Sequence, residues 1–304
     1  MSDDGDPFAN LDHVLGFTLP GRHARGRVAR LGPVLDTILA NHQYPPILAR
    51  LLAEALVLTA LLGTTMKEMD DQLTLQAHSQ GGVVDLLVCD YRAGALRGYV
   101  RHDPERLAQM PAMPSLFGLF GKGYLAITFD QAANKERYQG IVPLEGGSLA
   151  EAAESYFSQS EQLPSLVRLA VVDHGAAGHT AGGIMIQHLP EGEEGRERLH
   201  TRLDHPEWEH VAALARTLST EELVDPALPL ETIIWRLFHE EEIRVLPQAS
   251  LARGCRCSPA HIREVIQRFP PEERKTMAEA DGIIRVDCAF CARVFPVALE
   301  SLGR

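Results

Sequence analysis

Four of the five cysteines lie close to the C-terminus, in the patterns Cys255-x-Cys257 and Cys288-x-x-Cys291. A closed structural Zn²⁺ site is tetrahedral and is often built from four cysteine sulfurs. The CxxC spacing is typical of a zinc knuckle, whereas the rarer CxC spacing places two thiolates two residues apart. The pattern therefore predicts a small metal-binding unit in which Cys255, Cys257, Cys288 and Cys291 hold one Zn²⁺.

The rest of the chain indicates the compartment of these thiols, and we expect it to be the cytoplasm. The N-terminal residues 1–7 are acidic and polar, unlike a secretory signal. The most apolar stretch, residues 47–66, is interrupted by Arg50 and Glu54. Its charge-free part, residues 55–66, is shorter than the ~20 residues of a membrane span. Cytoplasmic thiols stay reduced, so four clustered cysteines indicate metal binding rather than a disulfide framework.

The net charge of −12 is unevenly distributed and argues against nucleic-acid binding. Residues 191–242 carry 14 acidic and 5 basic side chains, a net charge of −9. Residues 251–304 carry 9 basic and 7 acidic side chains, a net charge of +2. Non-specific affinity for nucleic acid comes mainly from cations that neutralise phosphates. We therefore expect no nucleic-acid partner and no membrane partner.

Residues 1–190 are predicted to form an α+β core domain with a largely antiparallel sheet packed with helices. One helix begins at Pro33, and a second, apolar nearly all round, spans residues 46–63. Ser148 begins a further helix as a capping box with Glu151. The short connections between the predicted strands favour antiparallel pairing. These strands are Leu73–His78, Val83–Tyr91, Ala95–Arg101, Tyr124–Asp130, Arg137–Leu144, Leu166–Asp173 and Ile184–Leu189.

Residues 191–243 are predicted to form a helical linker, and residues 244–304 a C-terminal zinc-binding domain. The linker begins with a charged hinge, residues 191–195, and has helices that start at Pro206 and Pro229. Each helix is apolar on one face only, so both must lie on a neighbour. We expect the C-terminal domain to be that neighbour, so that its collapse would free the apolar faces.

The remaining chemical signals are weak. Cys89 is expected to be a buried core thiol. His174 and His179 flank a glycine-rich turn and are expected to be solvated rather than to bind metal. The apolar loop 110–120, which includes Met113, is expected to lie against the sheet, with a protein-binding surface as the alternative. No phosphate loop, GxSxG, HExxH or GxGxxG motif occurs, so nothing in the sequence favours an enzyme.

At this point the chain resembles the redox-regulated 33 kDa heat-shock chaperone family, the heat-shock protein 33 family. The resemblance covers nearly the whole length. It depends on Cys255-x-Cys257 with Cys288-x-x-Cys291, on the segment Tyr156-Phe157-Ser158-Gln159-Ser160-Glu161-Gln162, and on the order of core, linker and terminal domain. An aspartate-rich N-terminal extension is not a feature we associate with the family.

The resemblance implies an ATP-independent holdase that is inactive when it is reduced and zinc-bound. It implies that oxidation releases the zinc, joins Cys255 to Cys257 and Cys288 to Cys291, and destabilises the linker. The active form would be a homodimer that binds unfolding or oxidatively damaged client proteins and prevents their aggregation under oxidative stress. A structural zinc contributes about 10–16 kcal/mol to folding. Two such short disulfide loops contribute only about 1.5–2 kcal/mol each, so we expect oxidation to unfold residues 244–304.

Two other functions stay open from the residues. The first is a thiol–disulfide oxidoreductase that uses Cys288 and Cys291. A catalytic CxxC normally begins a helix, whereas here β-like segments, residues 283–286 and 294–297, flank it. The second is a zinc-ribbon nucleic-acid module, which the charge balance disfavours.

Overall fold

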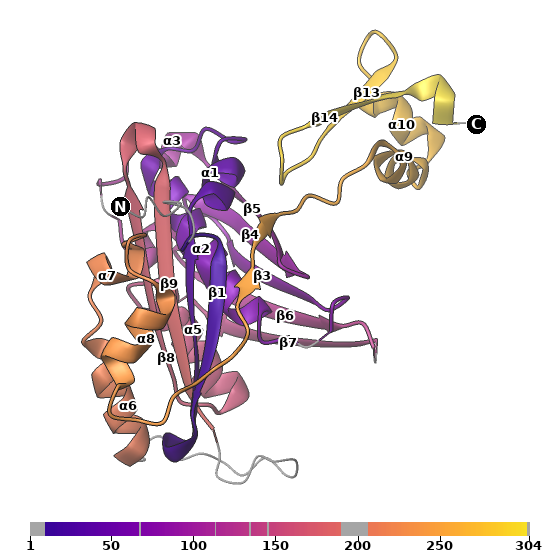
Figure 1. The fold of residues 1–304 in the computed structure, drawn as a ribbon. Helices are drawn as coiled ribbons and strands as arrows, with labels where there is room; N and C mark the ends of the chain where they lie inside the picture. The colour runs from indigo at the N-terminus through magenta and orange to yellow at the C-terminus, as the bar shows by residue number, and fades with distance from the viewer. Residues whose placement is uncertain are drawn as a thin grey trace, which may run out of the picture.

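The computed structural model describes residues 10–66, 68–112, 114–133, 135–144, 146–189 and 206–302. Two six-stranded sheets form the core, with the long helix α2 (Pro46–Gly63) in contact with both (Figure 1). Every strand pair except one is antiparallel. The expected α+β class with largely antiparallel sheets is confirmed.

The first sheet contains two strands that the sequence analysis did not identify, β1 (His13–Leu19) and β2 (Ala24–Leu31). Arginines alternate with small residues in the first half of β2, so the strand lacks the usual large apolar side chains. Gly26 leaves space for the Phe17 ring, whose nearest atom would lie 2.2 Å from an added Cβ. The sheet order is β10 (Arg244–Val245), β1, β2, β9 (His179–His188) and β8 (Ser165–Asp173), with β11 (Ala249–Ser250) also paired with β1.

The second sheet contains the strands that alternation predicted most clearly. Its order is β12 (Ala252–Arg253), β5 (Ala95–His102), β4 (Val84–Arg92), β3 (Gln72–Ser79), β6 (Gly123–Gln131) and β7 (Glu136–Pro143). The predicted bounds of β3 to β7 agree with these to within one residue. Of the predicted strands only β9, in the first sheet, is clearly longer than expected, because its small residues Ala181 to Gly183 gave no strand signal at its beginning.

Three core helices begin where the sequence predicted, at Pro33, at Pro46 and after Ser148, whereas two further short helices were not predicted. The core helices besides α2 are α1 (Pro33–Leu39), α3 (Pro104–Leu107), α4 (Leu116–Phe120) and α5 (Leu149–Tyr156), and α5 continues as a π-turn over Phe157–Glu161. By length and composition α2 could span a bilayer, yet 78% of its residues are buried inside the protein. The cap of α5 differs from the expected capping box. Ser148 accepts from the Glu151 amide, but the Glu151 carboxylate accepts from Gly147 at 2.7 Å rather than from Ser148.

The linker helices pack on the outer face of the first sheet, and not on the C-terminal domain as we expected. These helices are α6 (Pro206–Arg216), α7 (Thr220–Val224) and α8 (Leu230–Phe238). Their buried faces share one apolar cluster with Leu15, Phe17, Val28 and Ile184 of the sheet. The sheet offers a large apolar face at this place, which the small C-terminal unit cannot match. The expected hinge, residues 191–195, lies outside the described residues.

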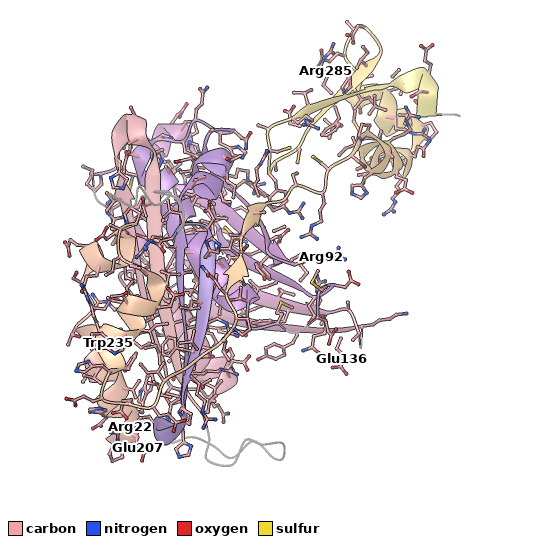
Figure 2. All side chains as sticks on the ribbon, in the orientation of Figure 1. Arg22, Arg92, Glu136, Glu207, Trp235 and Arg285 are labelled. Atoms are coloured by element: carbon pink, nitrogen blue, oxygen red, sulfur yellow. The ribbon has the colours of Figure 1, made fainter. Side chains whose placement is uncertain are left out.

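One residue pair illustrates the two sides of this helical layer. Trp208 is buried against the sheet, whereas the Trp235 side chain points outward and is 61% exposed (Figure 2). Trp235 is therefore already exposed to solvent in this structure. Trp208 stays a usable reporter of the packing of α6.

An extended segment, residues 244–254, connects the helical layer to the C-terminal unit, and we call it the strap (Figure 1). It contains β10, β11 and β12. Beyond it the chain forms α9 (Pro259–Gln267), α10 (Pro271–Met277) and the hairpin of β13 (Ile283–Asp287) and β14 (Val294–Ala298). This unit stands away from the two sheets and has its own small core of Ile266, Ile284, Val297 and Leu302. Short 3-10 turns occur at Pro20–Arg22, Gly175–Ala177 and Leu299–Leu302.

Candidate metal centre

The four C-terminal cysteines converge on one point, although they come from two separate segments. Cys255 and Cys257 follow the strap, and Cys288 and Cys291 lie in the turn between β13 and β14. The four sulfur atoms all lie within 4.8 Å of one another. Cysteines are the only members of this cluster among the described residues.

The sulfur spacing fits a tetrahedral zinc ion. Neighbouring sulfurs are 3.2 Å apart for Cys255 and Cys257, 3.6 Å for Cys255 and Cys288, and 3.5 Å for Cys257 and Cys291. Zn–S bonds of about 2.3 Å at tetrahedral angles place two sulfurs about 3.8 Å apart. The four cysteines could therefore hold a Zn²⁺ ion with only small adjustments. The distances also show that pairs within one motif and pairs between motifs are comparably close.

Local hydrogen bonds of the backbone fix the conformation of the chain around both cysteine pairs. In the hairpin turn the Cys288 amide donates to the Arg293 carbonyl at 3.0 Å, and the Ala292 amide donates to the Cys288 carbonyl at 2.8 Å. Ala292 has a φ of 53°, a left-handed conformation that closes the knuckle. After Cys257, the Ser258 hydroxyl accepts from the His261 amide at 3.1 Å and begins α9.

The electrostatics of the cluster oppose four thiolates without a cation. Burial disfavours the Cys255 thiolate, but hydrogen bonds from the Cys257 amide and from neighbouring thiols lower the pKa of Cys255 to about 7. Burial and those same neighbours raise the pKa of Cys257, and burial raises the pKa of Cys288. The Cys255 thiol thus loses its proton readily, whereas the thiols of Cys257 and Cys288 hold theirs more strongly. A divalent cation is the natural means of stabilising all four as thiolates.

The histidines that the sequence analysis considered lie elsewhere. His179 Nδ1 is 2.8 Å from Asp36 Oδ1, and His174 Nε2 is 3.2 Å from the Thr180 hydroxyl. The first contact fixes the turn between β8 and β9 to α1, and the second lies across that turn. His174 is exposed, as expected, whereas the His179 side chain is only 23% exposed and has a structural role.

The fifth cysteine, Cys89, belongs to the core. Its side chain on β4 is fully buried, and burial raises the pKa of its thiol well above the usual range. Gly98 on β5 allows this packing, because an added Cβ would lie 2.8 Å from the Cys89 sulfur. A buried thiol of this kind is inert toward oxidants.

The surroundings of Cys288 and Cys291 differ from those of a dithiol oxidoreductase. β13 and β14 flank the motif as an antiparallel hairpin, as the sequence predicted, and no helix begins at Cys288. A catalytic CxxC takes its low thiol pKa from a helix N-terminus. This geometry does not support the oxidoreductase alternative.

A contact between the metal centre and the core, made by Phe290, one of the two residues between Cys288 and Cys291, was not predicted from the sequence. The Phe290 ring lies under the Arg97 guanidinium, whose carbon is 3.9 Å from the ring centroid. Tyr99 meets the same ring edge-on with centroids 5.0 Å apart. His42 Nε2 is 3.3 Å from the Phe290 carbonyl oxygen. Sequence spacing gave no signal for this contact, because its partners come from distant parts of the chain.

The other cysteine pair has a similar contact. Arg256, between Cys255 and Cys257, donates to the Gln72 side chain and lies 3.7 Å from the Asp90 carboxylate. Asp90 is almost fully buried and also accepts from Arg97 and, at 2.8 Å, from Thr74. Each cysteine pair therefore has one neighbouring residue that docks the metal centre on strands β3, β4 and β5 of the second sheet.

The apolar loop 110–120 only partly follows the expectation. Leu116, Leu119 and Phe120 of α4 are buried in the core, as expected for a loop that lies against the sheet. Phe117 is exposed on the outer side of the same short helix. Met113 lies outside the described residues.

Comparisons of the sequence and of the structure with known proteins lead to the same family and cover most of the chain. Residues 12–297 match the family described as Hsp33 protein. A protein of Caulobacter vibrioides named 33 kDa chaperonin is 41% identical over 302 residues, 97% of this chain and 98% of that protein. Proteins of the same name from Pseudoalteromonas atlantica and Escherichia coli are 36% identical (94% of this chain, 92% of that protein) and 34% identical (88% and 85%). The crystal structure of a 33 kDa chaperonin from Thermotoga maritima has a TM-score of 0.79 at 22% identity and covers 96% of this chain and 97% of its own.

Proposed function

The chain belongs to the Hsp33 family, which is a family of chaperones rather than an enzyme class, and from this premise we propose that it is a redox-regulated, ATP-independent holdase. The observation that supports the regulatory part of this proposal is the four-sulfur cluster. In the reduced state the protein binds one zinc ion and is inactive. Oxidation switches it to a form that binds unfolding proteins and prevents their aggregation.

Cys255, Cys257, Cys288 and Cys291 hold the zinc ion as thiolates in this proposal. The ion would supply charge compensation for the sulfurs and a crosslink between the strap and the β13–β14 hairpin. The small apolar core of the C-terminal unit, four buried side chains, makes it dependent on such a crosslink.

The oxidation step joins the sulfurs in two pairs. Each disulfide forms when two sulfurs give up two electrons to an oxidant such as peroxide, which takes two protons and becomes two waters. We propose the pairs Cys255–Cys257 and Cys288–Cys291, as the family resemblance implies, with Cys89 left reduced. Proximity does not select these pairs, because the sulfurs of different motifs lie as close. The peptide map of the oxidised protein tests the pairing.

The three parts of the chain then have distinct tasks. We propose that residues 1–190 form a core domain that stays folded, residues 191–243 a linker, and residues 244–304 the zinc-binding switch. The switch reaches the core through Phe290 and Arg256, and through the strap. Its collapse therefore acts first on the strap and only indirectly on α6, α7 and α8. The active form is a homodimer that works in the cytoplasm on damaged client proteins.

One experiment tests the whole proposal. Zinc content and suppression of the aggregation of a thermally unfolding client are measured on a single sample before and after peroxide treatment. We expect one zinc per reduced chain without suppression, and no zinc with suppression after oxidation. Suppression that is equal in both states would contradict the redox switch.

Two variants make that experiment specific. The Cys257→Ser/Cys291→Ser double variant should contain no stoichiometric zinc, because only two thiolates remain. Cys89→Ser, which changes the buried core thiol, is the matched control and should keep both zinc and switching. A stoichiometric zinc in the double variant would place the metal elsewhere.

A further inference from the structure

Within the part of the chain that the structure describes, each core sheet has one outer strand whose free side pairs with the strap alone. On the free side of β1 the strap supplies the two-residue strands β10 and β11, and on the free side of β5 it supplies β12. An open sheet edge presents unpaired amides and carbonyls that can pair with another chain. One segment, which ends at the residue before Cys255, thus covers both edges.

The strap binds these edges mainly through its backbone. The Leu246 amide donates to Gly16 of β1 at 2.8 Å, and the Leu251 amide donates to Asp12 at 2.7 Å. Two further amides, of Ala252 and Gly254, donate to Gly94 and Leu96 at 2.9 and 2.8 Å, beside and within β5. These bonds need no particular side chain on the strap.

The edges are shaped for the close approach of an extended chain. A Cβ added at Gly94 would lie 2.8 Å from the Ser250 carbonyl oxygen, and one at Gly16 would lie 3.0 Å from the Leu246 side chain. Leu251 inserts into the main core cluster where the strap crosses from β1 to β5. The edges therefore offer two sites for apolar side chains, a deep one that Leu251 occupies and a shallow one that Leu246 occupies. The two occupants are five residues apart in the strap.

The strap itself is weakly held. Leu251 is its only buried residue, Val245 is 52% exposed and Leu246 is 41% exposed. Pro247 has no amide to donate and interrupts the pairing with β1. A segment with so few buried contacts opens at low free-energy cost. Its remaining attachment is the metal centre, which begins one residue after the strap ends.

We propose that the edges of β1 and β5 form a binding site for extended segments of unfolding proteins, and that the strap occupies this site in the reduced state. The client segment adds to a sheet as an extra strand, with apolar side chains at the positions of Leu246 and Leu251. The proposal rests on the holdase function and adds to it the place and the chemistry of client binding.

Backbone recognition explains how one site serves many clients. Every unfolded chain presents amides and carbonyls, whereas an apolar surface alone selects for side-chain shape. The site also differs from the face under α6, α7 and α8, which those helices cover in this structure. Opening the edges requires release of the strap only.

A synthetic peptide of residues 244–254 tests the site, because it copies the occupant seen in the structure. A fluorescently labelled peptide should bind the oxidised full-length protein, and should bind the reduced protein at least about tenfold more weakly, since the chain's own strap competes. Unlabelled peptide should also displace client and reduce the suppression of aggregation.

Backbone methylation makes the test specific for strand addition. N-methyl groups at Leu246, Ala252 and Gly254 remove three amide donors and should weaken binding at least about tenfold. An N-methyl group at Arg253 is the matched control, because alternate amides of a strand point away from the partner. Its peptide should bind nearly as well as the unmodified one.

The outcomes separate this proposal from the holdase function. If the oxidised protein suppresses aggregation but does not bind the peptide, or binds the triply methylated peptide equally well, the edge site is wrong. If it binds the peptide in the expected amide-dependent way but suppresses no aggregation, the edges are a peptide site and the holdase function fails. Binding to both redox states with equal affinity would show that the strap does not occupy the site.

Discussion

At the residue scale, the two side chains enclosed by the cysteine pairs connect the metal centre to the core. Phe290 contacts Arg97 and Tyr99, and Arg256 approaches Asp90. Because Asp90 binds Arg97 as well, the two contacts share one buried carboxylate. In the proposed function, metal ligation would fix the position of both side chains, so the loss of the metal should release both contacts together.

We expect Phe290→Ala to make the protein easier to activate while it still binds zinc. The substitution removes a cation–π contact and an aromatic pair, together worth about 1–3 kcal/mol. Peroxide should therefore activate the variant several-fold faster than the parent, with one zinc per chain before oxidation. The time course of aggregation suppression together with the zinc content checks this.

Phe269→Ala is the matched control for that variant. Phe269 is a partly exposed aromatic residue of the same C-terminal unit, after α9 and outside the docking contacts. It should activate at the parental rate. Equal acceleration by both substitutions would show that Phe290 acts through the general stability of the unit and not through docking.

A second residue-scale feature is the buried Arg30, which fastens the linker helices to the core. Its guanidinium donates to the carbonyls of Leu223, Leu228 and Glu222 at 2.9, 2.8 and 3.1 Å. Burial lowers its pKa to about 10, so it stays charged at neutral pH. Gly182 allows the same approach, since an added Cβ would lie 2.2 Å from the Leu223 carbonyl oxygen.

Arg30→Met should loosen the helical layer, because three buried carbonyls lose their donors. We expect a loss of about 2–4 kcal/mol in the free energy of unfolding, with α7, which supplies two of these carbonyls, affected first and the packing of α6 beside it loosened as a result. Urea unfolding followed by the fluorescence of the buried Trp208 measures the effect. Arg137→Met, which removes an exposed ion pair with Asp130, should change the midpoint little. An unchanged midpoint in Arg30→Met would refute the role of Arg30.

At the element scale, the strap is attached to the metal centre and the linker helices are attached to the sheet. Helices α6 to α8 share an apolar cluster of more than twenty buried residues with the first sheet. The strap contributes a single buried leucine to the core. The free energy that holds an element in place increases with the apolar area that the element buries. The strap should therefore open well before the helices.

Hydrogen exchange on the reduced and oxidised protein checks that order. We expect residues 244–302 to lose protection first after oxidation, and residues 206–238 to lose it later and less. The core strands should keep their protection throughout. If the helices lost protection before the strap, the linker and not the strap would be the relay. Unchanged protection of residues 206–238 in a fully active sample would mean that the linker takes no part in activation.

The sequence predicted local structure far better than contacts between distant segments. Alternation located β3 to β7, and prolines located the starts of α1, α2 and α6, because these signals lie within one element. β1 and β2 were missed because Gly16, Gly26 and the arginines of β2 depend on partners elsewhere. The cysteine spacing correctly predicted that the four sulfurs lie together. It could not predict where Phe290 docks or which surface the linker helices contact, because both depend on tertiary packing.

At the scale of the whole molecule, the chain joins a large core to a small unit with little apolar packing of its own. The main cluster unites both sheets with α2, whereas the C-terminal clusters contain four and three buried residues. A net charge of −12 keeps such a chain soluble when apolar surface opens. The two parts should therefore differ sharply in how their stability depends on metal.

Zinc removal under reducing conditions should unfold the C-terminal unit and leave the core folded. The lost metal stabilisation, about 10–16 kcal/mol, equals or exceeds the total stability of a small domain. Acid should act in the same direction, because zinc affinity falls as protons compete for the four thiolates. Tryptophan fluorescence cannot report this change, since both tryptophans lie in the linker helices.

Methyl NMR signals of Ile284 and Val297, from the core of the C-terminal unit, can report it. With chelator and reductant present, both should move to unfolded positions, while signals of Val28 and Ile184 in the first sheet stay in place. Adding zinc back should restore them, which excludes oxidation as the cause. If the two methyl signals kept their folded positions without metal, the apolar core alone would sustain the unit. Oxidation would then have to act through the new disulfides and not through the loss of zinc.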